Sequence, residues 1–183
     1  MARPAIAAIC LLALAGCGAS DSGSAAGTKP PRPADLGAAP AALKRLYARP
    51  DRLLGGGVQA FRTELRRLRG HPVVVNKWAS WCPPCRAEFP YFRAQAAKRG
   101  ARIGFLGVDS NDSEEDARAF LAKLPVGYPS LRDPDSRIAA EFNGVQAFPT
   151  TAFYDRKGRV AYLHQGGYAT ERKLAEDIDR YAR

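Results

Sequence analysis

Cysteine and histidine are scarce in this sequence, which limits the sites that it can form. Its 183 residues include four cysteines and two histidines, His71 and His164. A fold held together by structural disulfides would use more cysteines at wider spacings. A zinc site needs four ligands. Cys10 would leave with an N-terminal signal and Cys17 would carry a lipid, so Cys82 and Cys85 have no second cysteine pair to complete such a site. We therefore expect no metal and no cofactor, with a metal-binding module left as a minor alternative.

Long apolar runs are also missing. The longest extends from Ala5 to Ala15, whereas a helix that crosses a bilayer needs about 20 apolar residues. The run follows a short basic start and has the length of the apolar region of a secretory signal. Leu14-Ala15-Gly16-Cys17 then resembles the bacterial lipobox, whose cysteine is lipidated. We expect residues 1–16 to be a lipoprotein signal peptide and Cys17 to anchor the chain at the extracytoplasmic face of the plasma membrane. An ordinary cleaved signal is the alternative.

Large side chains are nearly absent between residues 18 and 40. This stretch is rich in glycine, alanine, serine and proline, and Leu36 is its only large aliphatic residue. Such a composition buries too little surface to offset the entropy lost on ordering the chain. We interpret residues 17–40 as the lipidated cysteine with a flexible tether, which would extend about 25 Å as a coil. Residues 41–183 then form a single folded domain.

Acidic residues are outnumbered by basic ones, 18 against 28, so the formal net charge is +10. The basic residues are scattered, with one local cluster at Arg62, Arg66, Arg67 and Arg69. The cluster is typical of a solvated helix face, with apposition to an anionic membrane as the alternative. We expect no nucleic-acid partner, because the signal directs the chain out of the cytoplasm.

The apolar pattern predicts an α/β domain. Helix-period spacing and helix-ending residues predict helices over 41–48, 58–68, 82–98, 112–124, 135–142 and 170–181. Asp112 is the expected N-cap of the fourth, with Glu115 reaching back. Short β-branched or alternating runs predict strands over 73–75, 103–108, 150–154 and 160–164, the last two as an antiparallel hairpin. A βαβ unit followed by a ββα unit is the arrangement of a thioredoxin-like fold, a central mixed sheet flanked by helices.

The motif Cys82-Pro83-Pro84-Cys85 falls where a strand passes into a helix. The helix N-terminus favours negative charge, so Cys82 should have a lowered thiol pKa and react as a thiolate. Cys85, one turn later, is placed to resolve a mixed disulfide and should be the more buried of the two. Proline is tolerated at the first helical positions, whose N–H groups have no helical partner. The motif therefore predicts thiol–disulfide exchange, and an inert structural disulfide is the alternative.

The segment around this motif resembles a known family. Val74 to Pro90, read as VVNKWASWCPPCRAEFP, is similar to the active-site signature of the TlpA/ResA-like thioredoxins. The resemblance covers residues 55–182 and continues through Gly107-Val108-Asp109, Tyr128-Pro129, Asp133-Pro134-Asp135, Phe148-Pro149-Thr150-Thr151, Asp155 and Gly158. It implies a helical insertion between the βαβ and ββα units, which here would hold the helix over 112–124.

The resemblance also implies roles for single residues. Cys82 would be the nucleophile and Cys85 the resolving thiol. Pro149 matches a cis-proline that faces the disulfide, and the backbone of Phe148 would pair with an extended substrate strand. Phe148 is larger than the residue expected there, which bears on the substrate pocket. Trp81 would form a wall of the substrate groove. Pro83 and Pro84 of the motif complete the set of residues expected to bind the substrate.

Asn76 stands where plain thioredoxins carry a buried aspartate, so another base is needed for Cys85. Glu88 lies three residues after Cys85, on the same helical face, and matches an acidic position of the signature. We expect Glu88 to relay protons, with a solvent-facing glutamate as the alternative. Trp78 is expected in the core. Lys77 replaces an aromatic residue usual in the family, and the sequence suggests no function for it.

Two other activities of this fold fit less well. A thioredoxin-fold peroxidase would need Thr or Ser at position 79, where this chain has Ala79, and a Sco-like copper chaperone would need CxxxC spacing. We expect a monomeric, extracytoplasmic reductant of secreted or membrane protein disulfides, supplied with electrons by a membrane thiol–disulfide protein. Apocytochrome c, another secreted protein or a small thiol would all fit as substrate. A disulfide-forming oxidase is the alternative.

Overall fold

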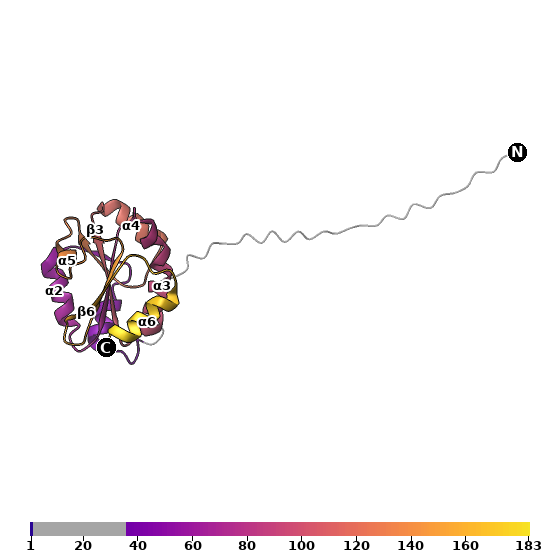
Figure 1. Ribbon diagram of the computed structural model, residues 1–183. Helices are drawn as coiled ribbons and strands as arrows, with labels where there is room; N and C mark the ends of the chain where they lie inside the picture. Colours follow the sequence, from indigo (N-terminus) through magenta and orange to yellow (C-terminus); the bar gives the residue numbers. More distant parts are fainter. Residues whose placement is uncertain (2–35) are drawn as a thin grey trace.

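The computed structural model of the protein describes residue 1 and residues 36–183 (Figure 1). The expected signal peptide, Cys17 and the tether as far as residue 35 lie outside the described residues. Leu36 and Ala39 pack against the domain core, and Lys44 Nζ donates a hydrogen bond of 2.7 Å to the carbonyl of Gly37. The packed domain therefore begins a few residues before the expected boundary at residue 41.

The core of the domain is a six-stranded mixed sheet with the order β1-β4-β3-β2-β5-β6. The strands are β1 (Leu53–Leu54), β2 (Val73–Trp78), β3 (Gly104–Ser110), β4 (Ser130–Asp133), β5 (Thr150–Tyr154) and β6 (Val160–Gln165). Strands β1, β4, β3 and β2 are parallel, and β5 pairs antiparallel with both β2 and β6. This confirms the predicted βαβ and ββα units.

Helices cover both faces of the sheet (Figure 1). They are α1 (Ala41–Tyr47), α2 (Gly57–Arg67), α3 (Pro83–Arg99), α4 (Glu114–Lys123), α5 (Arg137–Ala140) and α6 (Glu171–Tyr181). Helix α2 packs against α5, and α3 packs against α6 on the other side of the sheet. Every residue of β2 and β3 is buried, because both central strands are covered on two faces.

An aromatic cluster joins the sheet to the helix that carries the cysteines. Trp78 is 1% exposed, as expected for a core residue, and its ring centroid lies 5.3 Å from those of Phe89 and Phe120. Burying each such side chain contributes about 1.5–3 kcal/mol. The indole of Trp78 also donates a hydrogen bond of 3.2 Å to Ser130 Oγ. The cluster therefore fixes the start of α3 against the end of β2.

Three details of the predicted pattern were wrong. Strands β1 and β4 were not predicted, because β4 has no alternating apolar pattern and is defined by its parallel pairing with β3. Helix α5 is only four residues long and starts at Arg137 rather than residue 135. Helix α4 is capped by Ser113, whose Oγ accepts the Asp116 N–H at 3.0 Å, and not by Asp112. In contrast, the Thr170 cap of α6 is confirmed.

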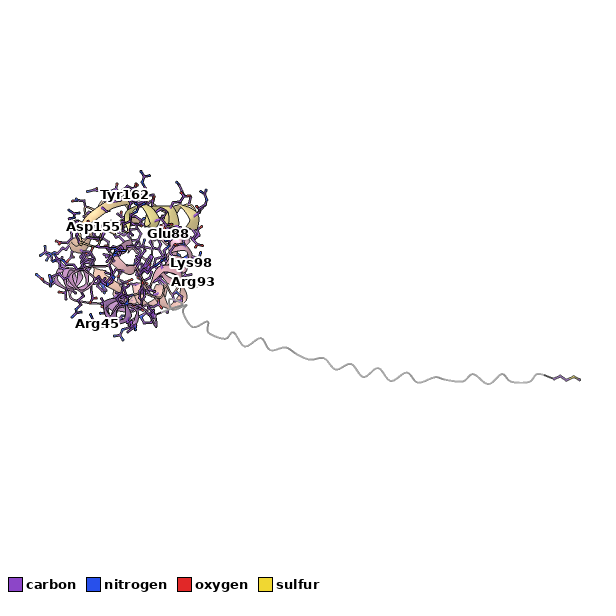
Figure 2. All side chains as sticks on the ribbon, turned by 90° about the horizontal axis from the view of Figure 1, so that it is seen from below. Arg45, Glu88, Arg93, Lys98, Asp155 and Tyr162 are labelled. Carbon is purple, nitrogen blue, oxygen red and sulfur yellow. A yellow bond between two sulfur atoms is a disulfide. The ribbon has the colours of Figure 1, made fainter. Side chains whose placement is uncertain are left out.

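The basic residues are spread over the surface, and two of the arginines on α2, Arg62 and Arg67, form ion pairs. Arg45 and Lys98, for example, lie on different parts of the molecule (Figure 2). Arg62 on α2 pairs with Glu141 at 2.8 Å. This arrangement favours the solvated helix face over a dedicated binding patch. In the part of the chain that is described, no helix has the length and apolar character needed to cross a bilayer.

Candidate active site

Cys82 and Cys85 form a disulfide at the N-terminus of α3, with their Cα atoms 5.3 Å apart. Cys82 is the N-cap residue, and its sulfur accepts the backbone N–H of Cys85 at 3.2 Å. Cys82 is 2% exposed and Cys85 0%, so the expected difference in burial is small. The two cysteines therefore differ in their position on the helix rather than in access to solvent.

Pro83 and Pro84 occupy the first two positions of α3, and both are exposed. Neither carries a backbone N–H, so neither can donate to the Cys82 sulfur. Within residues 36–183, the N–H of Cys85 is the one hydrogen-bond donor to that sulfur. The negative charge of a Cys82 thiolate would thus depend on the helix N-terminus and on few direct donors.

The cis-proline loop lies beside the disulfide. The peptide bond between Phe148 and Pro149 is cis, as the resemblance implies. A Cβ atom placed on Gly167 would lie 3.3 Å from Pro84 Cβ and 3.8 Å from Pro149 Cγ, so the loop after β6 closely contacts both prolines. The N–H and C=O of Phe148 make no hydrogen bond within residues 36–183. An extended peptide could pair with them.

Trp81 and Phe148 form an aromatic surface next to Cys82. Their ring centroids are 4.9 Å apart, and Trp81 is 55% exposed although most large apolar side chains are buried. The indole N–H of Trp81 donates to the carbonyl of Asn111 at 2.8 Å, which fixes the ring's orientation. Exposed aromatic surface beside a reactive group is typical of a binding site. The role of Trp81 as a wall of the substrate groove stays a prediction.

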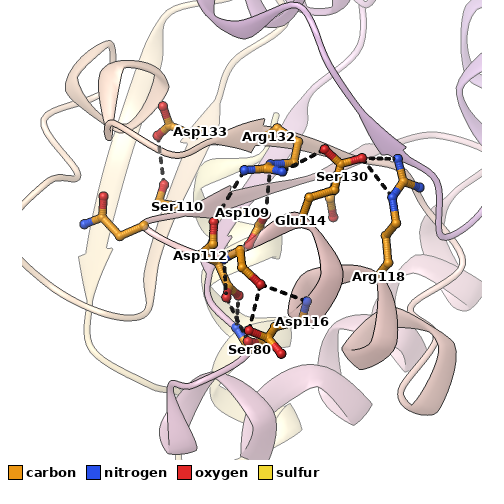
Figure 3. A network of polar contacts seen from close by, with 12 residues as sticks. Ser80, Asp109, Ser110, Asp112, Glu114, Asp116, Arg118, Ser130, Arg132 and Asp133 are labelled. Atoms are coloured by element: carbon orange, nitrogen blue, oxygen red, sulfur yellow. Dashed lines mark hydrogen bonds and ion pairs between the residues drawn. The ribbon is translucent and has the colours of Figure 1, made fainter.

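The loop before Cys82 is held by a polar network at the ends of β3 and β4 (Figure 3). Asp112 accepts hydrogen bonds from both the backbone N–H and the hydroxyl of Ser80, the latter at 2.9 Å. Asp112 thus supports the active-site loop instead of capping α4. Behind it, the pKa of Asp109 is raised to about 8, chiefly by burial; the nearby charge of Asp112 adds to this rise and that of Arg132 opposes it. Arg132 Nε lies 3.8 Å from Asp109.

Glu88 lies on the buried face of α3, the helix that carries the cysteines, and is fully buried, so it is not the solvent-facing glutamate of the alternative interpretation. Its carboxylate accepts the Asn76 side-chain amide at 2.8 Å and the Tyr168 backbone N–H at 3.0 Å. Burial raises the pKa of Glu88 to about 7, and these two hydrogen bonds oppose the shift. A carboxyl group with this pKa can exchange a proton near neutral pH. Figure 2 shows the position of Glu88 near α6.

Residues 53–178 match the Redoxin family. The chain belongs to this family. The redoxin is 33% identical over 146 residues to the thiol:disulfide interchange protein HelX of Rhodobacter capsulatus, with 79% of this chain and 80% of HelX covered. It is 40% identical over 99 residues to a thiol:disulfide interchange protein DsbE homolog of Paracoccus denitrificans. That match covers 54% of this chain and 52% of the relative, so the redoxin spans about half the relative's length.

Solved structures give the same result for the fold. The redoxin is similar to a secreted disulfide oxidoreductase of Mycobacterium tuberculosis, with a TM-score of 0.57, 26% identity, and 63% of this chain and 85% of that chain covered. It is also similar to the exposed lipoprotein thioredoxin of Streptococcus pneumoniae, with a TM-score of 0.56, 27% identity, and coverages of 63% and 89%. The redoxin therefore has a thioredoxin-like fold, as the sequence predicted.

Several residues that contact the segments around the disulfide could not be identified from the sequence of this redoxin. Gly167 and Tyr168 reach the site from the loop after β6, and the glycine pair that starts this loop was the only signal. Asn111 and Asp112 reach it from the end of β3. Within the described residues, no group of three or more His, Cys, Asp or Glu side chains is arranged to hold a metal ion.

Proposed function

We propose that this protein is an extracytoplasmic thiol–disulfide oxidoreductase that reduces disulfides of secreted or membrane proteins. The observation that carries the proposal is the Cys82–Cys85 disulfide at a helix N-terminus, facing cis-Pro149 and the unpaired backbone of Phe148. The family and the names of its relatives support the same chemistry.

In the proposed reaction, the reduced protein attacks a substrate disulfide with the Cys82 thiolate. A bond forms between Cys82 and one substrate sulfur, and the other substrate sulfur leaves as a thiolate. Cys85, after losing its proton, then attacks the Cys82 sulfur and releases the second substrate thiol. The substrate gains two electrons, and the protein ends in the disulfide form seen in the structure. A membrane thiol–disulfide protein would supply the electrons for the next cycle.

The direction of the reaction follows from how strongly the reduced form is stabilised. A more stable Cys82 thiolate makes the disulfide a stronger oxidant. Pro83 and Pro84 remove two possible hydrogen-bond donors to the thiolate. Arg86 is a cation that could also stabilise the thiolate, but its guanidinium lies 5.5 Å from the centre of the Phe120 ring. We therefore expect a moderately stabilised thiolate and a potential near thioredoxin's, about −270 mV, rather than near DsbA's, about −120 mV.

A redox titration tests this direction. The protein is equilibrated in dithiothreitol or glutathione buffers, its free thiols are alkylated, and the reduced fraction is read by mass. A Cys82→Ser/Cys85→Ser double variant is the blank. The expected midpoint is near −270 mV, and each 30 mV corresponds to about 1.4 kcal/mol for two electrons. A midpoint above about −150 mV would overturn the reductant assignment and favour a disulfide-forming oxidase.

We infer that Cys17 carries a lipid that anchors the chain at the extracytoplasmic face of the plasma membrane. The lipobox-like motif supports this, and one structurally similar protein is itself an exposed lipoprotein. Radiolabelled fatty acid should label the wild type in cells and fail to label Cys17→Ser. Cys10→Ser, which alters the apolar run only, should be labelled as the wild type is. Wild-type protein found entirely in the soluble fraction would contradict the anchor.

A further inference from the structure

Lys77 is a buried lysine for which neither the fold nor the exchange chemistry has yet given a use. Side chains alternate along a strand, so Lys77 points away from the face on which its neighbours Asn76 and Trp78 contact α3. It has no exposed surface. A lysine in such a place is costly unless its charge is well solvated by protein groups. The contacts of its ammonium therefore indicate why it is there.

The ammonium of Lys77 is held by one short loop. Its Nζ donates to the carbonyls of Gly144 at 2.7 Å and Val145 at 3.0 Å, and it lies 3.7 Å from the centre of the Phe148 ring. It makes no ion pair with a carboxylate in residues 36–183. Burial lowers the pKa of Lys77 to about 8, although the charge of Asp133 opposes this. Two carbonyl dipoles and an aromatic face thus stabilise the cation.

These contacts connect Lys77 to the aromatic surface formed by Trp81 and Phe148. Phe148, whose ring lies over the ammonium, has the unpaired backbone groups beside the disulfide and packs its ring against Trp81. A hydrogen bond of 2.8 Å from Thr150 Oγ1 to the carbonyl of Ala147 closes the end of the same loop. Lys77 is therefore linked through a single side chain to the surface on which a peptide would lie.

Stability alone does not explain this lysine. Replacing a buried charge by an apolar residue of similar volume is often neutral or stabilising. The family resemblance places an aromatic residue at this position, so the strand does not require a charge there. An apolar side chain could not donate hydrogen bonds to two loop carbonyls and at the same time make a cation–π contact with an aromatic ring.

We propose that Lys77 is a positioning residue that holds the loop over residues 143–149 so that Phe148 and Trp81 form a docking surface for extended polypeptide substrates. This rests on the proposed function and adds to it a residue that favours polypeptide disulfides over small ones. Small disulfides react at the Cys82 sulfur without lying along the loop. Their reaction rates should therefore not depend on Lys77, whereas a polypeptide should bind more weakly when the loop is no longer held.

The test compares wild type, Lys77→Met and the exposed control Lys123→Met in the reduced form. Each variant reacts with two disulfides, with dithiothreitol as the electron donor that regenerates the reduced protein. One is a peptide with several residues on both sides of its disulfide-bonded cysteine, and the other is hydroxyethyl disulfide. For Lys77→Met we expect a KM for the peptide raised about tenfold, from the loss of charged hydrogen bonds, with kcat within about twofold. The rate with hydroxyethyl disulfide should be unchanged. Lys123→Met should match wild type in all three values.

Two further measurements separate positioning from a structural role. The melting temperature of Lys77→Met should be equal to or above that of wild type, and amide exchange in residues 143–149 should be faster. Lys77→Gln replaces Lys77→Met if that variant fails to fold. A peptide KM within twofold of wild type, or equal losses with both disulfides, would overturn the proposal. A wild type that reduces neither disulfide would instead overturn the proposed function, and this role with it.

Discussion

Replacing Cys85 by serine is expected to trap the protein on its substrates. Cys82 keeps its place at the N-terminus of α3, where the helix dipole favours its thiolate, so it can still attack a disulfide. The mixed disulfide then persists, because the thiol that would release it is missing. Cys82→Ser should lose exchange altogether, since Cys85 lies one turn inside the helix, away from the N-terminus that favours a thiolate. Non-reducing gels and intact mass of protein isolated after acid quenching measure both results.

The double variant Cys82→Ser/Cys85→Ser is the matched control, and it should form no mixed disulfides. Equal trapping by the two single variants would contradict the assignment, because both cysteines would then be equally able to attack. The comparison is informative here since Cys82 is itself only 2% exposed. Position on the helix, rather than exposure, is therefore the physical basis for expecting Cys82 to react first.

Replacing Glu88 by glutamine is expected to slow exchange about a hundredfold near pH 8, the range usual for loss of a general base. The pKa of Glu88 is raised to about 7, so its carboxylate can accept the Cys85 proton above that pH and not below. In wild type the resolving step should accelerate as pH rises through about 7, and this rise should vanish in Glu88→Gln. Single-turnover rates between about pH 5 and 9 measure the profile.

The same substitution should cost little stability. Burial raises the pKa of Glu88 from 4.5 to about 7, so the folded protein binds its proton more tightly than the unfolded chain does between these values. The contribution of Glu88 to stability therefore falls as pH rises through that window, and glutamine removes this loss. Glutamine can accept the Tyr168 N–H through Oε1. If the Asn76 amide, which now donates to Glu88, turns over, the glutamine Nε2 can donate to Asn76 Oδ1, which has no partner within residues 36–183.

Glu64→Gln is the control for Glu88→Gln. Glu64 is also buried, but it lies on α2 and pairs with Arg49 at 2.9 Å and Arg67 at 3.0 Å. Its substitution should lower the melting temperature and leave the pH–rate profile of exchange unchanged. If the profile of Glu88→Gln is also unchanged, Glu88 has a structural role and another group takes the proton from Cys85.

The parts of the fold that the sequence predicted are those with strong local patterns. The β-branched run of β2, the prolines that start α3, the turn between β5 and β6, and the Thr170 cap each identify an element without distant partners. Strands β1 and β4 have no such pattern. Ser130 joins the sheet because Gly107 lets it approach: a Cβ on Gly107 would lie 2.0 Å from Ser130 Oγ.

The site shows the same division. The two cysteines and Pro149 could be identified because each lies in a short motif of neighbouring residues. The hydrogen-bond partner of Glu88 in the loop after β6 was not predictable, since Tyr168 lies 80 residues later in the chain. Lys77 had no interpretation for the same reason, because its partner carbonyls at Gly144 and Val145 are 67 and 68 residues away. Contacts across such distances follow from the sheet order, not from a local pattern.

The disulfide of this protein joins cysteines only three positions apart. A cross-link stabilises a fold chiefly by restricting the unfolded chain, and the effect grows with the ring that it closes, reaching about 3 kcal/mol for a ring of about 15 residues. By the same relation, a ring as small as this one contributes less, about 2 kcal/mol. The architecture of the domain rests on its buried core, so the domain can alternate between its two redox states with only this modest change in the entropy of the unfolded chain.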